Sequence, residues 1–427
     1  MNSRIPVIFL STFFISTHTF KLGIENISLA TIAHITKKNP KNLKIGLITN
    51  QTGKTQDGTR SIDYLIQNKI PLCTLFTAEH GINGTILAGK SVQNDIDEKT
   101  GLPVISLYQH EHKKIIEPEK FESFDLIIFD MQDVGMRHYT YISTLYRVLE
   151  AIAHAKIPLL VCDRPNLLGG NMEGPLVEKN LHSFISIAPI PLRHGMTIGE
   201  LALFFNKKIV PVHANLFVLS MAEYSRDVHP KKELLAPLSP NITSLRSAHG
   251  YSFLGLLSEI KPFDVGVGTP QAFQKIGLPS GTVTESCWKE AQKILSSHGI
   301  ESSFNQYTRG AQNKAYEGLD LHIPNISSVR SFSLLMALVS LFQTHNVELG
   351  FSPSFDKAMG TSLVREGFLT KKSHDKASSL IKRNIIHFYN NADDCFLYKP
   401  YPTIKMSALQ MPPLTEYTMF QCLQIHA

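Results

Sequence analysis

The hydrophobic positions of this chain gather in short runs that recur along its first half. Each run holds about four to seven apolar residues and is ended by polar ones. Strands that are buried on both sides of a parallel sheet have this pattern. It predicts strands in the segments KIGLITN (44–50), IPLCTLFTAEH (70–80), LPVISLY (102–108), DLIIFDMQD (125–133) and IPLLVCDRPN (157–166), with a sixth at 215–221.

Segments with helical spacing of apolar residues separate these runs. Residues 59–68 carry Ile62 and Leu65 three apart, and residues 141–155 place a stripe of leucine, valine and isoleucine on one face. Alternation of strands and helices predicts an α/β fold, a Rossmann-like parallel sheet with helices on both faces.

The second half has a different texture. Proline, serine and glycine interrupt it from about residue 238, and the alternation becomes irregular. We predict helices at 285–297 and 329–343, and a loop at 350–356. The predicted domains are a Rossmann-like one at 21–247 and a smaller α+β one at 248–427, which completes a cleft.

The first twenty residues predict a secretory signal peptide. Arg4 supplies a minimal basic start, and residues 5–15 form an apolar stretch too short to span a bilayer comfortably. No cysteine follows that would carry a lipid, so no stable membrane anchor is expected. This favours a secreted or periplasmic protein. A buried N-terminal segment in a cytoplasmic protein is the alternative.

Composition narrows the function classes. The 427 residues include 42 lysines and arginines against 36 aspartates and glutamates, which gives a net charge of +6. No dense basic run exists, so nucleic-acid binding is not expected. The five cysteines form no CxxC pair, and the chain contains no dinucleotide, phosphate-loop, GxSxG or HExxH motif. A zinc site or redox pair of the common kind and a nucleotide or dinucleotide role are therefore not expected.

Polar residues follow four of the predicted strands directly. The carboxyl ends of parallel strands meet at one edge of a sheet, where ligands bind. We therefore expect these polar tips to converge in a single cleft, although one or two of them alone would be ordinary turns or helix caps. The tips are Asn50 to Gly53, Glu79 to Gly81, Asp130 to Asp133, and Asp163 to Asn166.

The carboxylates of these tips suggest acid/base chemistry. Glu79 follows its strand directly, and partial shielding by Phe76 would suit a general acid. Asp130 and Asp133 flank Gln132, and neighbouring carboxylates in an enclosed site separate each other's pKa values. A solvated loop glutamate and a helix N-cap are the respective structural alternatives.

Fixed positive charges accompany the carboxylates. Arg137, Arg164 and Arg193 each have a structural alternative, but three around one cleft suggest an anionic substrate. Tyr139 offers a ring face to a sugar or to the core. Thr197 and Glu200 form a capping box, which makes Glu200 structural and leaves Arg193 and His194 beside the positive end of the following helix.

The motifs together resemble the exo-acting β-N-acetylmuramidases of the NamZ type, formerly a domain of unknown function. The matching segments are GLITNQTG at Gly46, EHGINGT at Glu79, TGLPVISLY at Thr100, DMQDVGMRHYTYIST at Asp130, DRPNLLGGNMEGP at Asp163 and PIPLRHGMTIGELA at Pro189. The resemblance implies release of terminal, non-reducing β-1,4-linked N-acetylmuramic acid from peptidoglycan fragments. It also implies a smaller second domain beside the Rossmann-like one, and no metal or organic cofactor.

The resemblance maps the leading catalytic candidate of the family onto Glu79. We predict that Glu79 protonates the glycosidic oxygen, with His80 and Asp130 completing the catalytic set. The predicted partner is a muropeptide or amino sugar; the oligomeric state stays open. The predicted substrate-binding set is Asn50, Gln132, Asp133, Arg137, Tyr139, Asp163, Arg164, Asn166, Arg193 and His194.

One departure from the family pattern affects the second domain. The segment EIKPFDVGVGT (259–269) stands where the family carries EGTNVSEGRGT, so Val265 replaces a glutamate and Val267 an arginine. Lost charge in this loop would change substrate preference or weaken activity. The alternative hypothesis is a non-catalytic muropeptide-binding protein, which a turnover assay distinguishes.

Overall fold

The computed structural model describes residues 20–87, 89–108, 115–226 and 237–404. The predicted signal peptide, 1–20, lies almost wholly outside the described residues. No helix within these ranges combines the length and the apolar character needed to cross a bilayer.

A seven-stranded sheet forms the first half of the molecule, in the order β3-β4-β2-β1-β5-β6-β8. Its six parallel strands confirm all six predicted ones, and β3 joins the edge as a short antiparallel strand. The strands are β1 (Ile45–Thr49), β2 (Leu72–Thr77), β3 (Asp95–Ile96), β4 (Pro103–Ser106), β5 (Leu126–Asp130), β6 (Pro158–Cys162) and β8 (Asn215–Leu219).

Both faces of this sheet are buried, as the runs of apolar residues predicted. Ile45 and Leu47 of β1 pack in one hydrophobic cluster with Ile32 and Leu65, whereas Ile48 packs in the other. Alternate side chains of a strand point to opposite faces, so a run that is apolar throughout needs a helical layer on each side. The first layer contains α1 (Leu29–Thr36) and α2 (Ser61–Gln67), and the second α3 (Tyr141–Ala155) and α4 (Ile198–Phe204).

The second half is an α+β arrangement, as predicted. Its antiparallel sheet has the order β10-β12-β11. The elements are α5 (Leu245–Leu257), β9 (Ile260–Lys261), β10 (Lys275–Pro279), α6 (Glu285–Ser297), β11 (Glu301–Arg309), β12 (Lys314–His322), α7 (Ser331–Thr344), β13 (Gly350–Phe351), α8 (Phe355–Met359), α9 (Leu363–Gly367) and α10 (Lys371–Ala392).

One segment differs from the sequence prediction. Residues 350–356 were predicted as a loop, but β13 pairs with β9 there and α8 begins at Phe355. The division into domains after residue 247 stays a prediction; residue 247 itself lies within α5.

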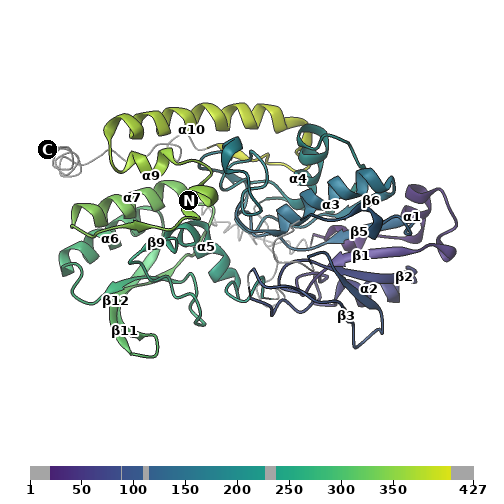
Figure 1. Ribbon diagram of the computed structural model, residues 1–427, viewed down its shortest axis with the longest axis horizontal. Coiled ribbons are helices and arrows are strands. Elements are labelled where there is room, and N and C mark those ends of the chain that lie inside the picture. Colours follow the sequence, from purple (N-terminus) through teal and green to yellow (C-terminus); the bar gives the residue numbers. More distant parts are fainter. Residues whose placement is uncertain (1–19, 88, 109–114, 227–236, 405–427) are drawn as a thin grey trace, which may run out of the picture.

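The end of the described chain returns to the first half. The helix α10 runs along the top of Figure 1 towards α4, and the rings of Phe388 and Phe204 lie 5.0 Å apart. Further on, β14 (Thr403–Ile404) pairs with β7 (Asn171–Met172). The Tyr398 hydroxyl donates a hydrogen bond to Asp163 at 2.7 Å, so the last segment ties the two halves together.

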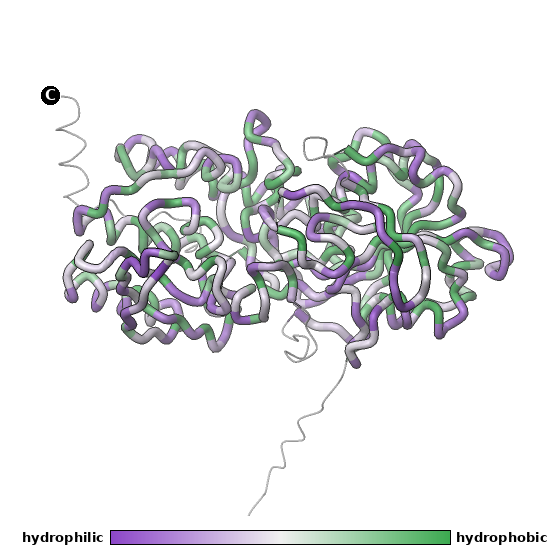
Figure 2. The backbone as a smooth tube through the Cα atoms, turned by 60° about the horizontal axis from the view of Figure 1, so that its bottom comes forward, coloured by the Kyte–Doolittle hydropathy of each residue, from purple (hydrophilic) through white to green (hydrophobic). Residues whose placement is uncertain are grey.

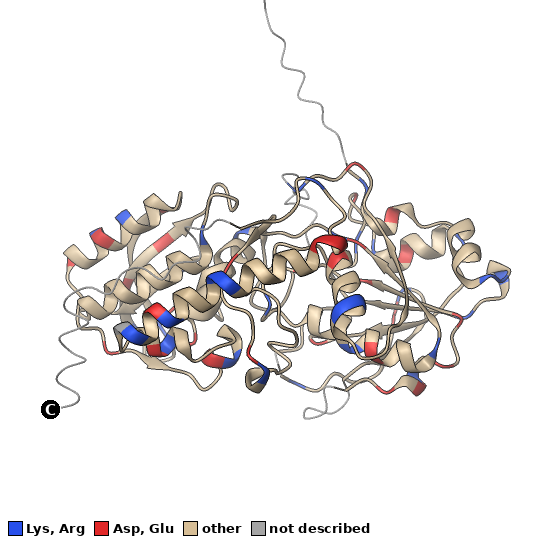
Figure 3. Cartoon of the chain, turned by 90° about the horizontal axis from the view of Figure 1, so that it is seen from above, with Lys and Arg blue, Asp and Glu red and all other residues tan. Residues whose placement is uncertain are grey.

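The distribution of polarity follows this architecture. In Figure 2 hydrophobic stretches run through the inside of each half, and hydrophilic stretches recur at the outer loops. In the view of Figure 3 basic and acidic residues are interspersed along the helices, α10 among them. A net charge of +6 is therefore not concentrated in one basic stripe on the face shown.

Candidate active site

The four polar tips emerge side by side, because β2, β1, β5 and β6 are neighbours in the sheet. They do not open onto one cleft, however. Glu79 and His80 line a cavity of about 630 Å³, whereas Asn50 lines a second cavity of about 570 Å³. Neither cavity is lined by Asp130, Arg164 or Arg193. The single pocket expected from the sequence is thus divided in two, with a buried polar network beside it.

The larger cavity lies between the two halves of the chain, and we call it the carboxylate cavity. Glu79 and Tyr139 reach it from the first half, and Tyr251, Glu259 and Phe273 from the second. It therefore exists only when both halves are folded against each other.

Both oxygens of Glu79 accept hydrogen bonds. The Thr140 hydroxyl donates to its Oε2 at 2.5 Å, and the Gly89 amide donates to Oε1 at 3.1 Å. Thr140 is the N-cap residue of α3, yet its hydroxyl makes no cap hydrogen bond within the helix. It serves Glu79 instead, so the start of α3 orients the carboxylate. Only 7% of Glu79 is exposed.

Glu259 is the second carboxylate of this cavity, and the sequence reasoning had not chosen it. It lies between α5 and β9, and its Oε2 accepts hydrogen bonds from the hydroxyls of Ser352 and Ser354. The cavity thus has one oriented glutamate from each half.

His80 lines the cavity through a tight turn. Its φ is +73° and that of Gly81 is +77°, so the backbone is left-handed at two successive residues. Its Nδ1 lies 2.6 Å from the Ile86 carbonyl, which can only accept, so this nitrogen carries the hydrogen.

His138 also lines the cavity and was not selected from the sequence. Neither of its ring nitrogens has a hydrogen-bond partner among the described residues. Burial, with a smaller effect of the Arg137 charge, lowers the pKa of His138 to about 3. It is therefore a neutral imidazole, in which one ring nitrogen is a donor and the other an acceptor.

Aromatic rings form much of the remaining wall. The His138 ring lies 4.8 Å from that of Tyr251, which lies 5.0 Å from Phe273. Tyr139 also contributes a ring, and its hydroxyl donates to the Leu238 carbonyl at 2.5 Å. Such faces suit the apolar side of a sugar ring.

Asp130, the predicted catalytic partner, has a different environment. It is completely buried, and Arg164 Nε and Nη2 donate to its two oxygens at 2.7 Å each. The Ser61 hydroxyl donates to it as well. The donors Nε and Nη2 of Arg164 are thus engaged by groups of the protein, because Nη2 also donates to the Lys54 carbonyl. This pair joins β5 to the tip of β6.

Three further predicted substrate-binding residues also make hydrogen bonds within the protein. Asp163 accepts from Tyr398, Thr197 and the Gly199 amide, and burial raises its pKa to about 6. The side chains of Gln132 and Asn166 donate to backbone carbonyls, of Pro165 and Met196 among others. These contacts fix the tip loops.

Arg137 and Arg193 point into the protein instead of into a cavity. Arg137 is completely buried and donates to the carbonyls of Pro175, Ile190, Ala358 and Met359. Arg193 pairs with Glu173 at 2.8 Å and also donates to Val329. Both join the first half to the second.

Asp133 and His194 pair with each other. His194 Nε2 lies 3.2 Å from Asp133 Oδ2, which also accepts from the Gly135 amide. The capping box expected at Thr197 and Glu200 is present, and Glu200 also pairs with the buried Arg226. The structural interpretation of Glu200 is confirmed.

The altered loop of the second half borders the carboxylate cavity. Val267 lines it, whereas Val265 is buried. Arg309 Nη2 donates to the Val267 carbonyl at 2.6 Å, so an arginine from β11 holds the loop that has lost one.

The fold and the cavity define a class of protein. A glycoside hydrolase places two carboxylates beside the sugar ring, and Glu79, Glu259 and several aromatic side chains line one cavity of this chain. Within the described ranges no group of three or more histidine, cysteine or acidic side chains is placed to hold a metal ion.

The chain belongs to the NamZ family of exo-β-N-acetylmuramidases. Residues 45–246 match the family model for the N-terminal domain, and residues 249–398 match that for the C-terminal domain. The chain is 37% identical, over 339 residues, to the peptidoglycan β-N-acetylmuramidase NamZ of Bacillus subtilis. The aligned residues make up 77% of this chain and 80% of that protein.

Two solved structures have a similar fold. Both are DUF1343 family proteins from Bacteroides fragilis, with TM-scores of 0.74 and 0.67. Each is 27% identical, over 89% of this chain and 99% of the other.

Proposed function

We propose that this protein hydrolyses terminal, non-reducing β-1,4-linked N-acetylmuramic acid from peptidoglycan fragments, with the carboxylate cavity as its active site. The observation that carries the proposal is the presence of Glu79 and Glu259 on the walls of one cavity. Family membership indicates which sugar is released, and the two carboxylates of the cavity indicate how the glycosidic bond is hydrolysed.

Glu79 is the proton donor in this mechanism. Its carboxyl group protonates the glycosidic oxygen as the bond to the anomeric carbon breaks, and the leaving sugar departs neutral. Thr140 and the Gly89 amide fix the direction of the carboxyl group, so the proton is delivered from one side of the ring.

Glu259 faces the oxocarbenium-like centre as nucleophile or as the base for a water molecule. We prefer it to Asp130, because Arg164 engages both oxygens of Asp130 and Asp130 lines neither cavity. His138 and the aromatic wall hold the sugar.

The test compares two leaving groups. Glu79→Gln should lower kcat/KM at least about 100-fold for a muramic acid–glucosamine disaccharide, whose leaving group needs a proton. It should lower it much less for a dinitrophenyl muramide, whose leaving group does not. Glu259→Gln should impair both substrates.

The matched control is Glu285→Gln, which changes an exposed glutamate paired with Lys289 and should leave both rates unchanged. Full activity of Glu79→Gln on the disaccharide would refute the mechanism. Saturable binding without turnover by the unaltered protein would refute hydrolysis and favour a muropeptide-binding protein.

We further propose that the protein acts outside the cytoplasm, which agrees with a cell-wall substrate and with the N-terminal pattern of Arg4 and residues 5–15. Cell fractionation, with N-terminal sequencing of the mature chain, tests this. Recovery of the full-length chain in the cytoplasm would contradict it.

A further inference from the structure

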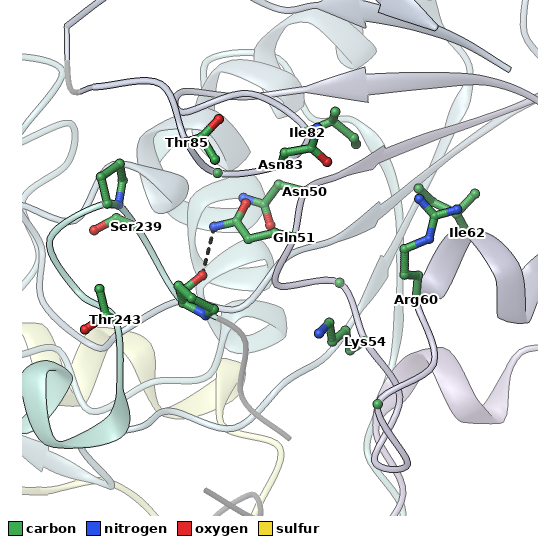
Figure 4. Close-up of a pocket in the computed structure, with 15 residues that line it drawn as sticks. Asn50, Gln51, Lys54, Arg60, Ile62, Ile82, Asn83, Thr85, Ser239 and Thr243 are labelled. Carbon is green, nitrogen blue, oxygen red and sulfur yellow. Dashed lines mark hydrogen bonds between the residues drawn. The ribbon is translucent and has the colours of Figure 1, made fainter. Parts of the chain in front are cut away.

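The second cavity, of about 570 Å³, has no role in the mechanism above. We call it the amide cavity, because Asn50, Gln51 and Asn83 line it together with Lys54, Ser239 and Thr243. Figure 4 shows Asn50 and Gln51 side by side, with Ser239 and Thr243 across from them. Its residues come from the tip of β1, the loop after β2 and the segment that precedes α5.

The amide cavity adjoins the carboxylate cavity. Ser239 lines both of them. The loop after β2 places His80 in the carboxylate cavity and Asn83 in the amide cavity. A sugar bound beside Glu79 can therefore extend a substituent into the neighbouring amide cavity.

One acceptor of the amide cavity, Gln51 Oε1, lacks a partner among the described residues. Gln51 Nε2 donates to the carbonyls of Pro237 and Leu238, so the amide of Gln51 is held in one orientation. Asn50 is only 4% exposed, and its Oδ1 accepts from the Thr52 amide and hydroxyl, which leaves Nδ2 beside the Tyr141 hydroxyl. A buried acceptor without a partner favours a ligand that donates to it.

Lys54 adds a positive charge. Its ammonium forms no ion pair within the part of the chain that the structure describes, whereas Arg60 on the same cavity is engaged by Asp63 and Asp97. The half-buried Lys54 therefore gives the cavity a net attraction for an anion.

We propose that the amide cavity binds the arm of the substrate that carries an amide and a carboxylate, and that Lys54 thereby determines specificity for muramic acid. This rests on the proposed function. Gln51 Oε1 accepts from an amide N–H, and Lys54 attracts the carboxylate. The arm is either the lactyl acid with its neighbouring acetamido group, or a peptide joined to the lactyl group. N-acetylglucosamine lacks the carboxylate and would lose the Lys54 interaction.

The test measures calorimetric affinity for three ligands, next to turnover of the disaccharide. The ligands are N-acetylmuramic acid, its lactyl N-methylamide, which has no charge, and its L-alanyl-D-glutamate conjugate. Lys54→Gln should raise the Kd for a carboxylate-bearing ligand about tenfold and leave the Kd for the methylamide unchanged. Lys54→Arg should retain most of the affinity, and the exposed Lys41→Gln serves as the control. Asn50→Asp, which puts a negative charge in place of Nδ2, should also weaken binding of the carboxylates selectively.

The results separate the two sources of the arm and the two hypotheses. A loss confined to N-acetylmuramic acid identifies the lactyl acid, and a loss confined to the conjugate identifies the peptide. Equal affinities of Lys54→Gln and the unaltered protein for all three ligands would overturn the proposal, as would an equal loss for all three. Absence of turnover with the pattern of affinities intact would overturn the hydrolytic function and leave the amide cavity standing.

Discussion

Arg137 offers a direct test of whether a buried arginine supports the site or binds the substrate. The sequence predicted substrate binding, whereas the structure gives Arg137 four carbonyl partners from both halves of the chain. The substitution Arg137→Met keeps much of the side-chain volume and removes every one of these donors. We expect it to destabilise the protein and to leave the intrinsic affinity for N-acetylmuramic acid nearly unchanged.

The magnitude follows from the partners. Four buried carbonyl oxygens lose a charged donor, and an unpaired buried acceptor costs about 1–3 kcal/mol. Part of this is offset, because burial lowers the pKa of Arg137 to about 9, which reflects unfavourable desolvation of its charge. The net loss expected is about 3–5 kcal/mol in the free energy of unfolding.

Urea unfolding followed by circular dichroism measures this loss, and calorimetry at low temperature measures affinity. The control is Arg147→Met on α3, whose partner Glu150 lies 2.6 Å away and is 30% exposed. A surface pair of this kind contributes about 0.5 kcal/mol or less. If Arg137→Met has the same urea midpoint as Arg147→Met but binds the sugar more than tenfold more weakly, Arg137 contacts the substrate. That result would refute a purely structural role of Arg137.

Two further predictions concern His138. A Cβ at Gly255 would lie 2.9 Å from His138 Nε2 and from the Tyr251 ring. Gly255→Ala should therefore lower kcat/KM about tenfold with a small loss of stability. The control is Gly350→Ala, which should be neutral because the nearest atom to a Cβ there lies 3.8 Å away. The pKa of His138 falls from 6.5 to about 3 on folding, so the unfolded chain binds the extra proton between these values and stability decreases as the pH falls through them. His138→Gln should therefore reduce the loss of stability between pH 7 and 4.5 by about 1–2 kcal/mol, after allowance for the cavity-facing side of the ring. Identical urea midpoints of the two proteins at both pH values would contradict this.

The sequence was sufficient for the elements that depend on local pattern. The six parallel strands, the helices at 141–155 and 285–297 and the capping box at Thr197 all follow from periodicity and from hydrogen bonds between residues close in the chain. The position of Glu79 at the end of β2 follows in the same way, because a strand that ends in polar residues presents them at the edge of the sheet.

The partners of charged side chains were not predictable in this way. Arg164 and Asp130 each stand at the end of a strand. Whether their side chains face a substrate or each other depends on the packing of β5 against β6, which brings them together as an ion pair. Arg193 finds Glu173 and the Val329 carbonyl, the latter 136 residues away. A buried charge must be paired or hydrogen-bonded, and the chain meets that demand with groups distant in sequence.

The sequence by itself determined a doubly covered parallel sheet and an acid at one of its edges, because a short apolar run and the polar residues that end it are local features of the chain. The tertiary structure alone decided that Glu259, 180 residues after Glu79, shares its cavity, and that Asn50 and Lys54 line another. Packing of the two halves brings these groups together, and no local pattern encodes a contact across that distance.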